Sequence, residues 1–144
     1  MMSILSSRVG VSISENFREV FSRISTNNRL SVPIGWGDHQ SSWENLNKSL
    51  ADNNPEFGLI SVWAILEKEM ELKFSKKLRK IGQGKNASIC DLASKELKYD
   101  NSSKSQLKSA MKKRNKVAHG SNVSVTWSDV NCVLKTAYQL FNRY

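Results

Sequence analysis

Large apolar side chains recur every three or four positions between residues 55 and 80, and this spacing constrains the fold more than any other feature of the chain. The positions are Leu59, Trp63, Leu66, Met70, Phe74 and Leu78. Such an interval places side chains along one stripe of an α-helix, whereas a half-buried strand would alternate apolar and polar residues. Asn54 and Pro55 provide an N-cap and a first-turn proline. The segment predicts one long helix that runs to about Lys80, supported by a Glu69–Lys73 pair one turn apart.

Four further helix starts are marked by a serine or threonine that is followed three residues later by an acidic or amide residue. These predicted N-cap residues are Ser41, Ser88, Ser103 and Thr126. Ser14 marks a short helix, and residues 26–40 have turn chemistry without apolar periodicity. Helices with one apolar stripe bury it against each other, and short connections favour antiparallel neighbours. We therefore expect an all-α, antiparallel helical bundle over residues 42–144, preceded by an N-terminal helix plus irregular extension over residues 1–41.

The size and composition of the chain suit one such domain. With 144 residues and 39% hydrophobic content, the chain can bury a core of its own. The longest apolar run, residues 57–66, falls well short of the roughly 20 residues that a membrane span needs, and residues 1–10 lack the basic start of a secretory signal. Cys90 and Cys132 lie in predicted helices without metal-ligand spacing. We expect buried free thiols, a cytoplasmic location, no membrane association, no metal and no cofactor.

Positive charge is concentrated in the last third of the chain. Residues 101–144 hold eight Lys or Arg and one acidic residue, which is +7 of the net charge of +9. Lys112, Lys113 and Lys116 lie beside the motif described next, and their potential would attract a polyanion such as RNA. The alternative is a solvated lysine face that binds no partner.

An arginine interrupts the apolar stripe of the helix that is predicted to start near Ser103. The stripe comprises Leu107, Ala110, Met111, Val117 and Ala118. Arg114 falls on the same stripe, where burial of a guanidinium costs several kcal/mol unless charges and hydrogen bonds offset it. The arginine therefore either serves a functional site or forms a structural pair with Glu67 or Glu71.

A histidine lies five residues beyond this arginine, at a helix stop. Gly120 is expected to end the helix in a left-handed turn, which places His119 in the last turn. Asn115 lies four residues before His119 and can orient its imidazole. Arg114, Asn115 and His119 thus form a candidate acid/base site for phosphate chemistry.

The motif R-N-x-x-A-H-G at residues 114–120 is similar to the R-(polar)-x-x-x-H motif of HEPN domains (higher eukaryotes and prokaryotes nucleotide-binding). Its setting resembles this family too: W-A-x-L-E at residues 63–67 lies on a long upstream helix, and T-W-S-D-V at residues 126–130 opens a final helix. This order is similar to that of bacterial HEPN groups found in phage-defence and toxin systems. The resemblance covers roughly residues 42–144.

Many HEPN domains are metal-independent ribonucleases, and the resemblance implies a role for each motif residue. The RNA 2′-hydroxyl attacks the adjacent phosphate and leaves a 2′,3′-cyclic phosphate and a 5′-hydroxyl end. His119 would act as general acid or base, Arg114 would hold the phosphate, and Asn115 would set the His119 tautomer or contact the phosphate. The family pattern also implies a homodimer or a related partner, and an antitoxin or regulatory protein. Ser121 stands where members silenced by modification carry tyrosine, so such regulation is not expected.

Other interpretations remain open at the level of sequence. The chain can be a non-catalytic HEPN-like module that dimerises or binds RNA or nucleotide, in which His119 only complements the helix dipole. A DNA-binding helical domain ranks third, because the motif helix offers mostly lysine rather than base-reading side chains. His39 is a second functional residue or, by preference, a loop histidine. Trp36 and Trp43 can stack on bases, although aromatic anchors of a core or dimer interface are commoner.

Overall fold

The computed structural model describes residues 37–80 and 84–143, and within them the chain is built from helices alone. The predicted all-α class is thereby confirmed. The helix expected near Ser14 and residues 26–36 of the irregular segment lie outside the described residues. The elements are the 3-10 turn η1 (Gly37–His39) and the α-helices α3 (Gln40–Ala51), α4 (Pro55–Lys80), α5 (Lys85–Glu96), α6 (Asn101–Ala118) and α7 (Trp127–Arg143).

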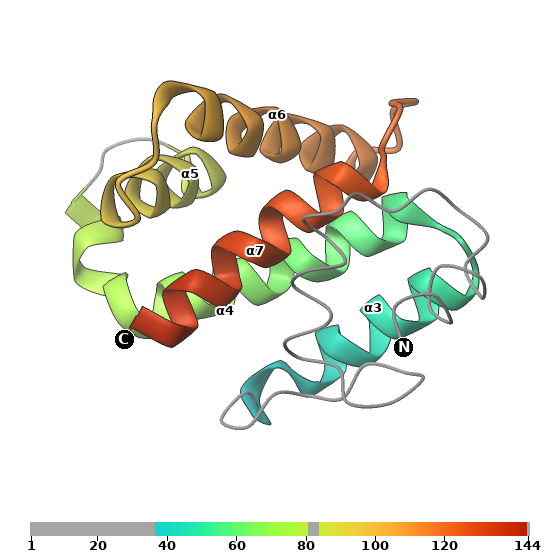
Figure 1. Cartoon of the computed structure of the whole chain (residues 1–144), viewed down its shortest axis with the longest axis horizontal. Coiled ribbons are helices and arrows are strands. Elements are labelled where there is room, and N and C mark those ends of the chain that lie inside the picture. The colour runs from blue at the N-terminus through green and yellow to red at the C-terminus, as the bar shows by residue number, and fades with distance from the viewer. Residues whose placement is uncertain (1–36, 81–83, 144) are drawn as a thin grey trace.

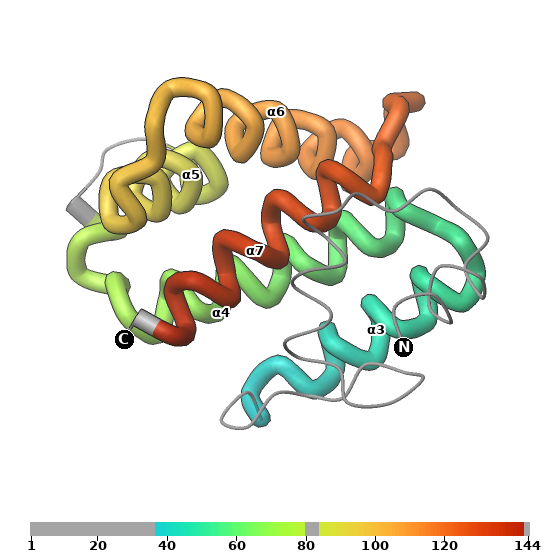
Figure 2. Tube along the Cα trace, in the orientation of Figure 1, coloured from blue at the N-terminus to red at the C-terminus, as the bar shows by residue number. Residues whose placement is uncertain are grey.

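The helices form a bundle in which α4 and α7 lie side by side at the centre (Figure 1). A Cβ on Gly58, near the start of α4, would lie 3.2 Å from Trp127 at the start of α7, and Lys73 of α4 reaches the carbonyl oxygen of Leu140 near the end of α7. These two helices therefore run in the same direction. Helix α3 is antiparallel to α4, and α5 is antiparallel to α6, as predicted (Figure 2). Helix α5 runs in the same direction as α4, because Lys85 at its start lies beside Glu67 and Glu96 at its end lies beside Lys77.

The apolar stripe of α4 supplies the middle of the core. Five of its six predicted members are buried, and Leu78 is half-buried where the stripe reaches the end of the helix. Complete burial of such a side chain stabilises the fold by about 1.5–3 kcal/mol, so this stripe is a main source of stability. Gly58 allows α3 and α7 to approach α4 closely, since an added Cβ would lie 3.0 Å from Ser49 Oγ.

Two predicted helix starts are confirmed by their capping hydrogen bonds. The Asn54 side chain accepts a hydrogen bond from the Phe57 backbone N–H at 3.1 Å, and α4 begins directly after it. At the start of α7, Asp129 accepts from the Thr126 N–H at 2.9 Å, while Thr126 Oγ1 accepts from the Asp129 N–H at 3.4 Å. Local sequence therefore fixes where these two helices begin.

The starts predicted at Ser88 and Ser103 are wrong by a few residues. Helix α6 begins earlier because Asp100 is its N-cap, and the Asp100 carboxylate accepts from the Ser103 N–H at 2.7 Å. A carboxylate is also favoured by the positive end of the helix dipole. Helix α5 begins at Lys85, so Ser88 lies inside the helix and is buried. In both cases a correct helix was predicted with a late first residue.

Neither cysteine of the described bundle forms a disulfide. Cys90 is buried in α5 and Cys132 is half-buried in α7, and both are free. Burial raises the pKa of each thiol to about 11, so both stay protonated at neutral pH. Across residues 37–80 and 84–143, no helix is both long enough and apolar enough to cross a bilayer.

Candidate functional site

The motif lies at the C-terminal end of α6, where the chain leaves the bundle. Helix α6 ends at Ala118, His119 is its C-cap, and Gly120 has a left-handed backbone with φ of +77°. The Gly120 N–H donates to the Val117 carbonyl at 3.0 Å, and the Ser121 N–H donates to the Lys116 carbonyl at 2.9 Å. The predicted glycine stop is confirmed, and it presents His119 at the surface.

The His119 imidazole is exposed, and no described residue forms a hydrogen bond or ion pair with it. An imidazole at a helix C-terminus interacts favourably with the dipole when it is protonated. Beyond this interaction, neither ring nitrogen is committed to the fold within the described residues. Both nitrogens are therefore accessible to a bound molecule.

Arg114 lies on the predicted stripe of α6, at the point where that stripe emerges from the core. Leu107, Ala110 and Met111 are buried, whereas Arg114 is half-buried. Its Nη1 group donates to Asn115 Oδ1 at 3.3 Å, and its buried Nε atom has no hydrogen-bond partner. A buried donor without an acceptor costs free energy, and the net charge of this guanidinium is not matched by a described carboxylate.

Arg114 does not form the structural ion pair with Glu67 or Glu71 that the sequence left open. Both carboxylates lie 2.6 Å from the ammonium group of Lys85 at the start of α5. These hydrogen bonds raise the pKa of Lys85 to about 12, which keeps the lysine charged. Lys85 therefore binds the two acidic side chains that were candidate partners of Arg114, and its single positive charge offsets one of their two negative charges.

Asn115 is bonded to Arg114 and to α5. Its Oδ1 atom accepts from Asn86 Nδ2 at 2.8 Å as well as from Arg114, and Asn86 Oδ1 accepts from the Trp63 indole N–H at 3.0 Å. The link between Asn115 and His119 is the helical backbone hydrogen bond of 3.1 Å. The structure thus brings Arg114 and Asn115 together through their side chains, with His119 one turn further along α6.

The three lysines predicted to bind RNA fall into two groups. Lys112 and Lys116 are exposed and form no ion pair with a described residue. Lys113 is half-buried, and its ammonium lies 3.0 Å from Asp129 in the capping box of α7. Lys113 thus joins α6 to the start of α7, whereas Lys112 and Lys116 contribute uncompensated charge at the surface.

His39 is not the loop histidine that the sequence favoured. It lies in η1 at the N-cap of α3, it is only 3% exposed, and its Nε2 atom lies 2.7 Å from Glu69 Oε1. Lys73 lies 3.3 Å from the other Glu69 oxygen and donates to the carbonyl of Leu140. The predicted Glu69–Lys73 pair is confirmed, but no local signal could reveal a partner thirty residues away. The start at Ser41 also moves, because α3 begins at Gln40.

The Glu69 carboxyl has a pKa below its ordinary value of 4.5. Burial alone would raise this pKa, but the hydrogen bond with His39 and the positive charge of Lys73 outweigh the effect of burial. Glu69 is therefore held as a carboxylate inside the bundle.

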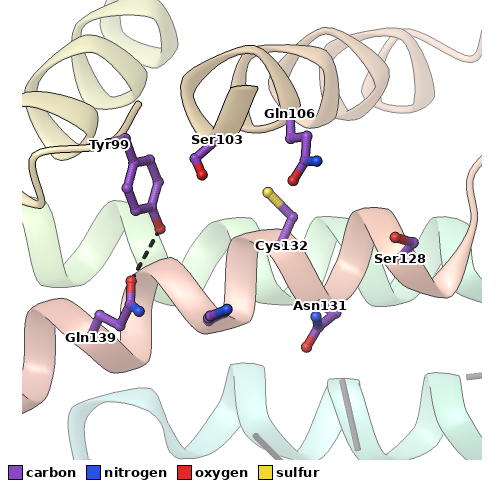
Figure 3. A pocket seen from close by; sticks show the side chains of 8 residues that line it. Tyr99, Ser103, Gln106, Ser128, Asn131, Cys132 and Gln139 are labelled. Carbon is purple, nitrogen blue, oxygen red and sulfur yellow. Dashed lines mark hydrogen bonds between the residues drawn. The ribbon is translucent and has the colours of Figure 1, made fainter. Parts of the chain in front are cut away.

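A separate polar cavity of about 190 Å³ lies along α7, facing α6 (Figure 3). Its lining comprises Tyr99, Ser103, Gln106, Ser128, Asn131, Cys132, Lys135 and Gln139. The Tyr99 hydroxyl lies 2.6 Å from Thr136 Oγ1 and 3.2 Å from Gln139 Oε1, and burial raises its pKa to about 12. None of the predicted site residues lines this cavity. Its only sequence signal is the helical spacing of residues 128, 132, 135 and 139.

Among the residues that the structure describes, no group of three or more histidine, cysteine or acidic side chains is placed to hold a metal ion. Comparison with known proteins gave no match to a family model, to a curated protein or to a solved structure.

Proposed function

We propose that the protein is a metal-independent endoribonuclease of the HEPN type. The observation that carries this proposal is that one end of α6 carries both an exposed imidazole without a described partner and a half-buried guanidinium without a described carboxylate. A guanidinium suits the non-bridging oxygens of a phosphate, and an imidazole can serve as a general acid or base.

The proposed reaction is a transesterification within the RNA. A base removes the proton of a 2′-hydroxyl, the 2′-oxygen attacks the adjacent phosphorus, and the bond to the 5′-oxygen breaks as an acid protonates the leaving group. The products are a 2′,3′-cyclic phosphate and a 5′-hydroxyl. Arg114 would stabilise the negative charge that grows on the phosphoryl oxygens, a role that fixed donors perform well.

Proton balance argues for a dimer. The reaction needs one group that accepts a proton and one that donates a proton, yet the sequence holds two histidines and His39 is engaged with Glu69 in the bundle. A second copy would supply a second His119. We therefore propose a homodimer in which two α6 ends line one cleft.

Electrostatics supports RNA rather than a small acidic metabolite as the substrate. Lys112 and Lys116 leave uncompensated charge on the helix that carries the motif, and residues 101–144 hold +7 of the net charge. Such a surface attracts a polyanion with strong salt dependence. We further propose that the enzyme acts in the cytoplasm as a toxin or antiviral-defence effector, controlled by an antitoxin or regulatory protein.

The second candidate is a non-catalytic HEPN-like module that dimerises or binds RNA or nucleotide. The observation in its favour is that Asn115, which the catalytic interpretation places beside His119, uses its side chain to bind Asn86 and Arg114. In this alternative the lysines bind RNA and His119 has no chemical role.

The test incubates purified wild type, Arg114→Ala and His119→Ala proteins with total cellular RNA in EDTA and identifies the fragment ends. Asn122→Ala, which alters an exposed side chain near the same helix end, is the matched control. The proposal expects 2′,3′-cyclic phosphate ends with wild type and control but not with the two site variants. Equal cleavage by His119→Ala would refute it. Salt-dependent RNA binding by all four proteins without scission would favour the binding module.

A further inference from the structure

We infer that Asn86 is a positioning residue for Arg114, acting through Asn115 and held in place by Trp63. This inference deepens the proposed function and rests on it for its catalytic consequence. Three hydrogen bonds carry it: Trp63 to Asn86 at 3.0 Å, Asn86 to Asn115 at 2.8 Å, and Arg114 to Asn115 at 3.3 Å. They connect the centre of α4, the start of α5 and the end of α6 in one hydrogen-bonded network.

The donor and acceptor at each step of this hydrogen-bonded network are determined at its buried end. Trp63 is fully buried, and its indole N–H can only donate. Asn86 must therefore turn its oxygen toward Trp63, which leaves its NH₂ group toward Asn115. Asn115 must in turn present its oxygen, since an NH₂ group there would face another donor. That oxygen is the atom that accepts from Arg114, so a core tryptophan determines which face of Asn115 the guanidinium meets.

Ion pairs hold the start of α5, which carries Asn86, against α4. The neighbouring residue Lys85 binds both Glu67 and Glu71 of α4 at 2.6 Å. Those carboxylates lie one and two turns beyond Trp63 on the same helix. The ion pairs hold α5 against α4. They also engage two carboxylates that could otherwise pair with Arg114, so that the charge of Arg114 stays available for a phosphate.

The consequence for catalysis is preorganisation. An arginine side chain has several rotatable bonds, and a guanidinium fixed before the substrate arrives loses less freedom at the transition state. One exposed turn of α6 cannot provide this order alone, because Arg114 is only half-buried and its Nε atom has no acceptor. The hydrogen bonds that begin at the buried Trp63 supply this order from the core.

The test replaces Asn86 with leucine, which has a similar shape and no hydrogen-bonding groups. We expect kcat for RNA cleavage to fall roughly ten- to a hundredfold, as for a misplaced catalytic group. The Kd for a 2′-deoxy-substituted RNA, which cannot cyclise, should stay within about twofold because the lysine surface is unchanged. Trp63→Phe should lower kcat in the same direction by a smaller factor.

Two controls separate positioning from general loss of packing. Trp127→Phe removes another indole hydrogen bond of the bundle, the 3.2 Å bond to Asn53, and should leave kcat unchanged. In an Arg114→Ala background, Asn86→Leu should have no further effect, because residues that act as one unit are not additive. Additive losses, or equal losses in Asn86→Leu and Trp127→Phe, would overturn the inference.

A readout without RNA keeps this inference distinct from the proposed function. The Arg114 Nε–H and Trp63 indole N–H signals in a ¹⁵N NMR spectrum should both shift in Asn86→Leu and stay in place in Trp127→Phe. If both signals shift but the protein cleaves no RNA, the hydrogen-bonded network is supported and the proposed nuclease activity is refuted. An Arg114 signal that does not respond to Asn86→Leu would overturn the network even in an active enzyme.

Discussion

The two histidines of this chain differ in what surrounds them. His39 is 3% exposed and bonded to a carboxylate that also lies beside Lys73, whereas His119 is exposed at a helix end with no described partner. The first imidazole is used by the fold, and the second is left to the solvent or to a ligand. The same residue type therefore marks a structural cluster in one region and a candidate site in the other.

The His39 cluster joins three parts of the bundle. His39 precedes α3, Glu69 and Lys73 belong to α4, and Lys73 donates to the carbonyls of Leu140 and Phe141 near the end of α7. Buried charges persist only when they are paired, and removal of one partner leaves the others uncompensated. Arg114 has no such carboxylate partner among the described residues, which leaves its charge available to the phosphate that we propose it binds.

The sharpest division between the two regions is expected from alanine substitution of each histidine. His119→Ala should lower RNA cleavage about a thousandfold, the usual scale for a lost general acid or base, and leave the melting temperature unchanged. His39→Ala should lower the melting temperature and, in assays well below it, cleave RNA at nearly the wild-type rate. Cleavage assays and thermal melts on both variants measure this. Loss of activity only in His39→Ala would reverse the assignment.

The next largest effect is expected on stability, at Glu69. Glu69→Ala removes the shared partner of His39 and Lys73, and should lower the free energy of unfolding by about 3 kcal/mol. Chemical denaturation of wild type and variant measures the difference. As a control, Glu44→Ala alters an exposed carboxylate and should change stability by less than about 0.5 kcal/mol. Equal stability of Glu69→Ala and wild type would show that the cluster is dispensable.

The same cluster predicts a pH dependence. The folded-state pKa of Glu69 lies below 4.5, so its stabilising contribution is present above that pH and is lost as the pH falls through the folded-state value. The stability difference between wild type and Glu69→Gln, followed from neutral pH downward, should therefore shrink as the pH falls below 4.5. Denaturation curves across this range measure it, and a difference that grows on acidification would contradict the assigned sign.

Much of the fold could be predicted because its signals are local. The α4 stripe, the Asn54 cap and the Thr126–Asp129 box depend on residues within one or two turns, and each is confirmed. The late start predicted for α6 had a local cause too, since Asp100 competes with Ser103 for the N-cap. What the sequence could not reveal is contact between helices: the parallel course of α4 and α7 depends on where two intervening helices pack.

The candidate site divides along the same line. The glycine stop and the surface position of His119 follow from a local rule. The surroundings of Arg114 do not, because Lys85 takes the carboxylates of Glu67 and Glu71, and Asn86 takes the side chain of Asn115. Lys85 and Asn86 both belong to the start of α5, whose N-cap the sequence predicted four residues too late, at Ser88 instead of Gly84. Because the start of α5 was predicted too late, the contacts around Arg114 could not be predicted.

Among the lysines, a smaller difference is expected between paired and unpaired charges. Lys112→Gln and Lys116→Gln should each weaken RNA binding severalfold and reduce the slope of log K against log salt by about one unit. Lys113→Gln should reduce that slope less, since Asp129 already compensates its charge, but should cost some stability. RNA binding measured over a series of salt concentrations tests this, and equal slopes for all three variants would contradict it.

The smallest expected effect concerns the turn that presents His119. Gly120 has φ of +77° with no atom within 4 Å of an added Cβ, so Gly120→Ala introduces backbone strain without a clash and should cost about 1 kcal/mol. Gly37→Ala, also in open space but without a positive φ, is the matched control and should be nearly neutral. Because Gly120 directs only the exposed histidine, its variant should lower cleavage further than this loss of stability explains and leave the Glu69 pH dependence intact. A change in that pH dependence would mean that the two histidine regions are coupled through the bundle and do not act separately.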